Sequence, residues 1–233
     1  PRPVHLEEVR FSRTQTDHLL KFTLPGPMTI CDTIADVHYG SRPEMAMAFA
    51  DILNTEAREL VDAGVDLIQL DEPAFNVFMD DVKEWGIDAL HKAIEGLQCT
   101  TAVHICYGYG IDENLRWKET LGNEWRQYEE IFPALNTSRI DQVSLECAGS
   151  RVPNSLMGLL KDKAVMVGAV EVTPDQVESP EEVAATIRSA LPYVDAERLL
   201  PCTNCGMAPL PYEVALGKLK SLAAGAALVR KNL

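Results

Sequence analysis

Six short apolar runs alternate with helix-length amphipathic stretches along this 233-residue chain, and the alternation constrains its fold more than any other feature. The runs are residues 19–24, 65–70, 101–106, 142–145, 164–172 and 198–202, and each has the character of a buried strand. Regular alternation of strand and helix predicts βαβ units around a parallel sheet. We therefore expect one α/β domain spanning residues 1–233.

The clearest amphipathic stretch runs over residues 43–63 and predicts a long helix. Gly64 is the expected stop signal after it. Two Ser-x-x-Glu pairs, Ser41 with Glu44 and Ser179 with Glu182, have the spacing of helix-starting capping boxes. The side chains predicted to share the buried face of the long helix are Met45, Phe49, Ile52, Leu53, Leu60 and Val61.

A barrel and an open doubly wound sheet both satisfy this alternation. No Gly-x-Gly-x-x-Gly sequence or P-loop follows any of the runs, so the usual signature of a nucleotide-binding open sheet is missing. This favours a (β/α)8 TIM barrel, which needs eight strands where six are visible. Either two strands escape detection or the first part of the barrel is absent.

Charge and cysteine content exclude several classes of function. The 21 basic and 35 acidic residues give a net charge of −14, which argues against binding to nucleic acid or to an anionic membrane. No stretch approaches the roughly 18 apolar residues of a membrane span. Six unevenly spread cysteines do not resemble a disulfide scaffold. Reduced thiols, and with them a cytoplasmic location, are expected.

Reactive side chains follow five successive runs. They are Asp71 and Glu72, then His104 and Cys106, then Glu146, then Glu171, and finally Cys202 and Cys205. Because the carboxyl ends of barrel strands converge on one face, residues far apart in sequence should meet there. The pattern therefore predicts a single functional site.

His104 and Cys106 stand two residues apart, so the alternation of a strand points both side chains to the same side. Imidazole and thiolate together suit zinc, although a core histidine beside a buried cysteine would give the same spacing. The Cys202-x-x-Cys205 pair is open to metal binding, thiol redox chemistry or packing. Asp71 and Glu72 could equally be a solvated turn.

Five ordered motifs make the chain similar to one family. They are Leu24-Pro-Gly-Pro-Met-Thr29, Ile68-Gln-Leu-Asp-Glu-Pro-Ala74, His104-Ile-Cys-Tyr-Gly108, Ser144-Leu-Glu146 and Asn204-Cys-Gly-Met207. Together they resemble the C-terminal catalytic barrel of cobalamin-independent methionine synthases, in a wider group that includes uroporphyrinogen decarboxylase-like barrels. The resemblance implies that the six strands are numbers three to eight, with the first two strand-helix units missing from this chain.

The resemblance also implies a zinc-dependent methyltransferase that moves a methyl group to the thiol of homocysteine and so makes methionine. Its zinc ligands correspond to His104, Cys106, Glu146 and Cys205. Asp71 corresponds to the residue that contacts the homocysteine amino group, and Glu72 beside it is expected to share in substrate binding. Asp71 and Glu171 are the expected catalytic residues.

Two departures from the family concern the methyl donor. The family's proposed proton donor, a histidine, is matched by Thr173, and no histidine follows His104. After Cys205 the family's basic Leu-Lys-Thr-Arg is replaced by Met-Ala-Pro-Leu, which removes basic residues beside the site. A folate donor must be protonated as it leaves, and Glu171 is the remaining candidate acid. These departures favour methylcobalamin or a corrinoid protein over methyltetrahydrofolate as donor.

Three other functions stay open on the sequence. Another zinc-dependent alkyltransferase, acting on a different small thiol, would share every metal ligand. A metal-free decarboxylase-like barrel would need basic residues for an acidic porphyrin, whereas the run ends here are acidic and thiol-rich. A thiol-redox barrel would join Cys202 to Cys205 in a disulfide.

Overall fold

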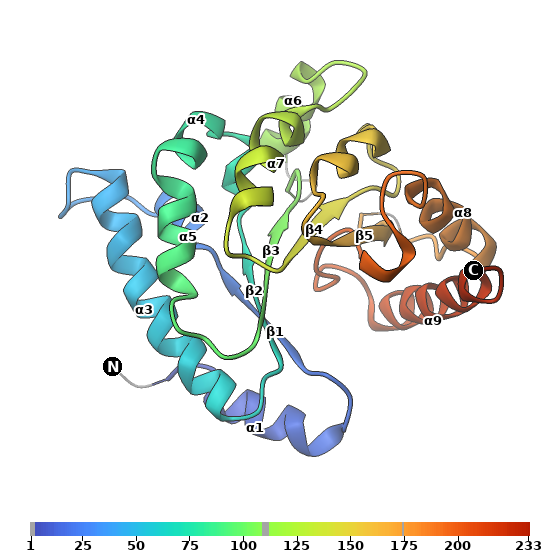
Figure 1. Ribbon diagram of the computed structural model, residues 1–233, viewed down its shortest axis with the longest axis horizontal. Coiled ribbons are helices and arrows are strands. Elements are labelled where there is room, and N and C mark those ends of the chain that lie inside the picture. Colours follow the sequence, from blue (N-terminus) through green and yellow to red (C-terminus); the bar gives the residue numbers. More distant parts are fainter. Residues whose placement is uncertain (1–2, 109–111, 174) are drawn as a thin grey trace. The chain divides into compact units, whose positions relative to one another are not determined.

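A computed structural model describes residues 3–108, 112–173 and 175–233 and contains the six predicted strands (Figure 1). The strands are β1 (Lys21–Pro25), β2 (Leu67–Asp71), β3 (Thr100–Ile105), β4 (Gln142–Glu146), β5 (Ala164–Val170) and β6 (Leu199–Thr203). All six are parallel and form one sheet in chain order, β1-β2-β3-β4-β5-β6. This confirms the α/β prediction and is consistent with part of a (β/α)8 barrel.

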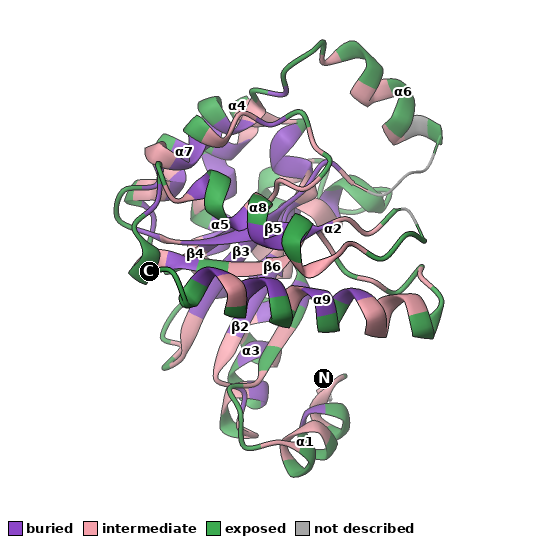
Figure 2. Ribbon diagram, turned by 90° about the vertical axis from the view of Figure 1, so that its right-hand side faces the viewer, coloured by how far each residue is buried: buried purple, intermediate pink, exposed green. Residues whose placement is uncertain are grey.

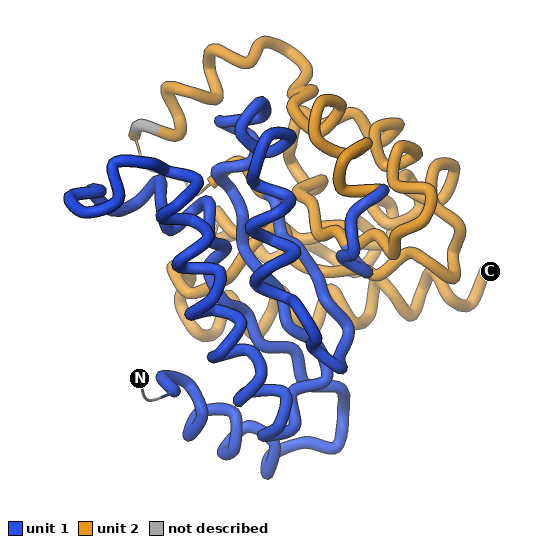
Figure 3. The backbone as a smooth tube through the Cα atoms, turned by 60° about the vertical axis from the view of Figure 1, so that its left-hand side comes forward, with its two compact units in different colours: residues 1–105, 137–142 blue, residues 106–136, 143–233 orange. Residues whose placement is uncertain are grey.

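The chain forms two compact units, coloured separately in Figure 3. The first contains the residues up to Ile105 together with Thr137–Gln142, and the second contains Cys106–Asn136 and Val143–Leu233. Helix α1 (Leu6–Gln15) precedes β1. The helical segments between the first three strands are α2 (Pro27–Thr33), α3 (Arg42–Asp62), a 3-10 turn (Pro73–Asn76), α4 (Met79–Asp81), a π-helical turn (Val82–Gly86) and α5 (Ile87–Ala93).

Strand register in the first unit brings the ends of its three strands level. Pro25 of β1 pairs with Asp71 of β2, and Asp71 pairs with His104 of β3. The carboxyl end of each strand follows from the sequence, because apolar residues occupy the buried positions of the strand and polar residues come directly after them. Asp71, Glu72 and His104 therefore belong to one edge of the β1-β2-β3 part of the sheet.

Helix α3 begins and ends where the sequence predicts. The Ser41 side chain accepts a hydrogen bond from the amide of Glu44, and Pro43 lies in the first turn, where its missing N–H costs nothing. Gly64 has φ +107°, a left-handed conformation that a residue with a Cβ rarely adopts.

The buried face of α3 differs in part from the prediction. Met45, Leu53 and Leu60 are buried as expected, but Ile52 is 57% exposed, so its assignment to that face was wrong. Small side chains complete the buried face instead: Ala46, Ala50 and Ala57. A helix that packs through alanines can approach its neighbours closely, so hydrophobic size alone did not identify its inner face.

The second unit contains the remaining helices, α6 (Asp112–Thr120), α7 (Gln127–Thr137), two 3-10 segments (Asn154–Leu159 and Ala196–Arg198), α8 (Pro180–Ala190) and α9 (Tyr212–Arg230). Helix α8 starts with the complete capping box predicted for Ser179 and Glu182. In Figure 2 strands β2 to β5 are largely buried, whereas α9 shows buried residues along one side and exposed residues along the other. Among the described residues, none of the helices combines the length and the apolar character needed to cross a bilayer.

Candidate metal centre and adjoining pocket

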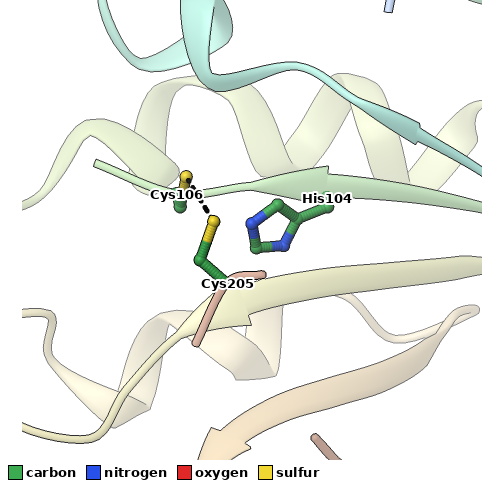
Figure 4. Close-up of side chains that lie close together, drawn as sticks. All are labelled: His104, Cys106 and Cys205. Carbon is green, nitrogen blue, oxygen red and sulfur yellow. Dashed lines mark hydrogen bonds between the residues drawn. The ribbon is translucent and has the colours of Figure 1, made fainter. Parts of the chain in front are cut away.

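Three predicted ligands come together at the ends of strands far apart in the sequence. His104 lies near the end of β3, Cys106 follows that strand, and Cys205 lies two residues beyond the end of β6. Each offers one ligand atom, and these atoms all lie within 4.8 Å of one another (Figure 4). The Sγ atoms of Cys106 and Cys205 are 3.9 Å apart. The arrangement supports the metal interpretation of Cys205.

The electrostatics of this group suit a cation. His104 and Cys106 are buried. The hydrogen bond with Cys205, followed by burial and the nearby Cys205 charge, raises the pKa of Cys106 well above its usual value. Two such thiols cannot both ionise without a compensating positive charge. Two thiols and an imidazole are the ligand types that zinc prefers, so the donor set fits that metal.

Asn204 holds Cys205 in place. Its Oδ1 accepts hydrogen bonds from the amides of Cys147 and Ala148 at 3.1 and 3.2 Å, and its Nδ2 donates to the carbonyl of Ala148 at 2.7 Å. The Thr203 hydroxyl donates to the Cys205 carbonyl at 2.8 Å. Sequence reasoning missed Asn204, although a polar residue flanked by Thr203 and Cys205 at a strand end was a usable signal.

Glu146 lies outside the three-residue group in the described structure. Its Oε2 accepts a hydrogen bond from the amide of Tyr107 at 3.2 Å, and its own amide lies 3.4 Å from the Tyr128 hydroxyl. The carboxyl group is half-buried and lines the same pocket as Cys205. Its proposed role as a metal ligand thus rests on the family resemblance, whereas its placement beside Cys205 is observed.

The other member of the Cys-x-x-Cys pair has a different environment. Cys202 Sγ lies 3.8 Å from the Ser144 hydroxyl. Burial, with a smaller contribution from Cys202, raises the pKa of the nearby Cys147 thiol. All six cysteines lie in the described part of the chain and are thiols. The pair therefore forms no disulfide here, and its two sulfurs contact different partners.

An aromatic cluster adjoins the thiols. The Tyr107 ring, one residue after Cys106, packs against Trp125 and Tyr128 with ring centroids 4.7 and 5.3 Å apart, and it stacks on Trp117 at 5.7 Å. Burial raises the pKa of Tyr107, so its hydroxyl stays protonated, and the Gln127 side chain lies 3.1 Å from it. Through these ring contacts, the segment that contains α6 and α7 packs against the residue that follows Cys106.

A cavity of about 390 Å³ opens beside Cys205 within the second unit. Its walls include Glu146, Glu171 and Thr173, and also Lys118, Trp125 and Arg151. The sequence showed only that the segment after Cys205 has lost its basic residues, and it did not identify Lys118 and Arg151 as residues of this pocket. The segment after Cys205 supplies none, as predicted, but the chain brings Lys118 and Arg151 to the same pocket from a loop and a helix that precede it.

Glu171 is held at the wall of this pocket by a buried ion pair. Lys218 of α9 is 0% exposed, and its Nζ donates to Glu178 Oε2 at 2.9 Å and to the Gln176 carbonyl at 2.6 Å. The other Glu178 oxygen accepts the amide of Glu171 at 2.9 Å. Gly149, in a left-handed conformation at φ +62°, leaves the space that the Glu171 carboxyl group occupies.

Asp71 and Glu72 of the first unit have separate environments. Glu72 is completely buried, and its oxygens accept the amides of Met28 and Thr29 and the Thr29 hydroxyl at 2.7–3.0 Å. Burial outweighs these hydrogen bonds and raises its pKa to about 7. Glu72, expected to face the substrate, instead anchors the start of α2. Asp71 is only partly buried and accepts a hydrogen bond from the Gln69 side chain at 2.8 Å.

The Glu72 carboxyl group should make stability depend on pH. Its pKa is raised from 4.5 to about 7 in the folded protein, so the neutral form is favoured by folding. The resulting stabilisation is complete below pH 4.5 and is lost as the pH rises through about 7. Relative to Glu72→Gln, the free energy of unfolding should fall by roughly 1–3 kcal/mol across that interval. Denaturant unfolding at several pH values measures it, and parallel curves for the two proteins would contradict the assignment.

A parallel α/β sheet with an imidazole and two thiols close together at its strand ends defines a barrel-type protein with a candidate metal site. Residues 1–227 match the family model described as the catalytic domain of cobalamin-independent synthase. The chain therefore belongs to the cobalamin-independent synthase catalytic-domain family, as the sequence motifs indicated.

Named relatives agree with this membership. A methionine synthase of Sulfolobus acidocaldarius is 31% identical over 232 residues, which are 99% of this chain and 63% of that protein. One from Saccharolobus solfataricus is also 31% identical, over 99% of this chain and 65% of that protein. The chain thus spans less than two thirds of the length of these curated relatives.

Comparison with solved structures also finds similarity to methionine synthases. A B12-independent methionine synthase from Shewanella sp. W3-18-1, in complex with selenomethionine, superposes with a TM-score of 0.96. It is 59% identical over the whole of this chain and 68% of that structure. A protein from Listeria monocytogenes, described as a putative vitamin-B12 independent methionine synthase, is 17% identical with a TM-score of 0.68 over 98% of this chain and 69% of that one, and supports the fold alone.

Proposed function

We propose that this chain transfers a methyl group to the thiol of homocysteine and thereby forms methionine. The observation that carries the proposal is the His104, Cys106 and Cys205 group, which lies beside a pocket large enough for a small-molecule donor. Family membership supports it, and the Shewanella relative was solved with selenomethionine, the selenium analogue of the product.

Zinc is the proposed cofactor of this site. His104, Cys106 and Cys205 would hold it, and Glu146 is the proposed fourth ligand because its carboxyl group lines the same pocket. When bound, zinc supplies Lewis acidity that lowers the pKa of an acceptor thiol and so provides a thiolate near neutral pH. Another small thiol would be activated in the same way, so the acceptor is set by residues outside this group.

Asp71 is the proposed contact for the substrate amino group. Its carboxyl group is partly buried and is held by a hydrogen bond from Gln69, which itself accepts from Lys21 at 2.8 Å. An ionised carboxyl group accepts a stronger hydrogen bond from an ammonium group than a neutral amide does, because both partners are then charged. Asp71 thereby distinguishes an amino-acid thiol from one without an amino group.

Methyltetrahydrofolate is the proposed donor, because the matched family is described as cobalamin-independent. The sequence favoured methylcobalamin on the ground that no histidine is present to protonate a folate. In the proposed step, the carbon–sulfur bond forms with the thiolate electron pair. The carbon–nitrogen bond breaks with its electrons on nitrogen, which takes a proton from Glu171. The ion pair that holds the Glu171 backbone at the pocket wall supports this assignment.

An assay of methionine formation from homocysteine, with methyltetrahydrofolate or methylcobalamin as donor, tests the proposal. We expect turnover with the folate that falls roughly 100-fold in Glu171→Gln, the range of general acid catalysis. Asp71→Asn should keep its zinc and raise the KM for homocysteine roughly tenfold, as expected for loss of a hydrogen bond to a charged group.

Comparing methylcobalamin with methyltetrahydrofolate tests the role of Glu171 separately from the choice of donor. Methylcobalamin needs no proton on its leaving group, so any methylcobalamin turnover should be insensitive to Glu171→Gln. An unchanged rate of methionine formation from methyltetrahydrofolate in this variant would show that Glu171 is not the proton donor. Turnover with methylcobalamin and none with folate would show that the donor preference inferred from the sequence was correct.

A further inference from the structure

The side chain of Asn204 joins the ends of two strands that are not neighbours in the sheet. Asn204 follows β6, whereas its side-chain hydrogen bonds reach Cys147 and Ala148, which follow β4, and β5 lies between these strands. The side chain is buried, and both ends of its amide are used, the oxygen by two backbone N–H groups and the nitrogen by a carbonyl. A reversed amide would face donors with donors, so its orientation is fixed.

Gly168 of β5 gives the Asn204 side chain the space to cross that strand. A Cβ atom at position 168 would overlap Asn204 Oδ1 and would lie 2.8 Å from the Leu145 carbonyl oxygen. The backbone of Gly168 is not left-handed, so space rather than conformational freedom accounts for a glycine here. The register of β5 against β6 also shifts between Gly168 and Val170, and such irregularities re-aim side chains beside functional sites. The local structure of β5 is thus adapted to the crossing.

Hydrogen bonds between sequence neighbours connect three of the proposed metal ligands. The amide of the residue after Cys106 donates to Glu146 Oε2 at 3.2 Å. The amide of the residue after Glu146 donates to Asn204 Oδ1 at 3.1 Å, and Cys205 comes directly after Asn204. The connection therefore runs from Cys106 through Glu146 to Cys205, all within the second unit. Asn204 supplies its last link.

We propose that Asn204 is a positioning residue of the metal centre, which fixes Cys205 relative to Glu146, and that Gly168 is required for this role. The proposal rests on zinc as the proposed cofactor and adds to it two residues that are not ligands. Residues that orient metal ligands commonly change metal affinity by roughly 10- to 100-fold. Asn204 holds the backbone beside the ligands rather than a ligand atom, so we expect the lower end of this range.

Zinc affinity, measured by competition with a chromogenic chelator, tests this role without methyl transfer. Asn204→Ala removes the three side-chain hydrogen bonds and should raise the Kd for zinc roughly tenfold. Asn204→Asp keeps an oxygen for the two backbone amides and should raise the Kd less. Asn136→Ala is the matched control, because both ends of the Asn136 amide bind Asp162, at 2.9 and 3.0 Å. This control should bind zinc as the wild type does.

Cobalt(II) distinguishes a positioning role from a general loss of stability. Cobalt(II) accepts the same types of ligand as zinc, and its visible absorption depends on the number and arrangement of those ligands. In the cobalt-saturated protein, Asn204→Ala and Gly168→Ala should both shift the absorption bands. Asn136→Ala should not shift them, nor should Gly158→Ala, since no atom lies within 4 Å of a Cβ placed at Gly158.

The outcomes are distinct from those of the methyl-transfer assay. An unchanged zinc Kd or an unchanged cobalt spectrum in folded Asn204→Ala would overturn the positioning role even if methionine is formed. A raised Kd with shifted bands, but without methionine formation, would leave this role standing and refute the proposed reaction. If Asn204→Ala does not fold, Asn204→Asp and Gly168→Ala provide the test, and wild-type Kd values and spectra in both would overturn the proposal.

Discussion

We expect the protein to purify with about one zinc per chain, and replacing Cys205 or Cys106 with serine should remove most of that zinc. Among the described residues, each thiol supplies one of the three ligand atoms that lie within 4.8 Å of one another, and a serine hydroxyl is a much weaker ligand at neutral pH. Metal analysis of protein purified without chelator measures the effect.

Cys202→Ser and Cys147→Ser are the matched controls for metal content. Cys202 contacts the Ser144 hydroxyl rather than the Cys106 sulfur, so both controls should keep their zinc. Full zinc occupancy in Cys106→Ser and Cys205→Ser would refute the metal site. Loss of zinc from Cys202→Ser alone would show that the other cysteine of the pair is the ligand.

Removing the buried charge of Lys218 should produce the largest loss of stability. In Lys218→Met, Glu178, which has an 18% exposed side chain, loses its cation while it still accepts the amide of Glu171. Breaking a fully buried ion pair on one side costs about 3–5 kcal/mol, and because Glu178 is partly exposed to water we expect a loss at the lower end of this range. Denaturant unfolding measures this cost. Lys220→Met, an exposed lysine on the same helix, should change stability by less than about 0.5 kcal/mol.

A double variant distinguishes the contribution of the ion pair to stability from its role in positioning Glu171. Lys218→Met with Glu178→Gln removes both charges, and such replacements are often close to neutral in stability. Stability should largely recover, whereas turnover with a folate donor should not, because Glu171 has lost the ionised partner of its amide. A loss below 1 kcal/mol in the single variant, or full activity in the double variant, would show that the ion pair has no such role.

The fold could be predicted closely because it depends on local patterns. Each strand lies within two residues of its predicted start and end, since apolar runs bounded by polar residues specify a buried parallel strand. The error at Ile52 has a local cause as well. Alanine carries little weight in a hydrophobic pattern, yet alanines form much of the inner face of α3.

The site was predicted less completely because part of it depends on tertiary contacts. His104 and Cys106 were accessible through their spacing and Cys205 through its motif. Lys118 and Arg151 reach the pocket from a helix and a loop that no motif marks. The adjacent Asp71 and Glu72 differ in burial because their side chains lie on different sides of the strand end.

The distance along the chain between the proposed metal ligands has a consequence for biosynthesis. Cys106 precedes Cys205 by 99 residues, and proteins are made from the amino end at about 5–20 residues per second. His104 and Cys106 are therefore synthesised roughly 5–20 seconds before the third ligand exists. During that interval the nascent chain offers only an incomplete ligand set. The complete set of proposed ligands, and with it any high-affinity metal loading, becomes available only after β6 and Cys205 have been made.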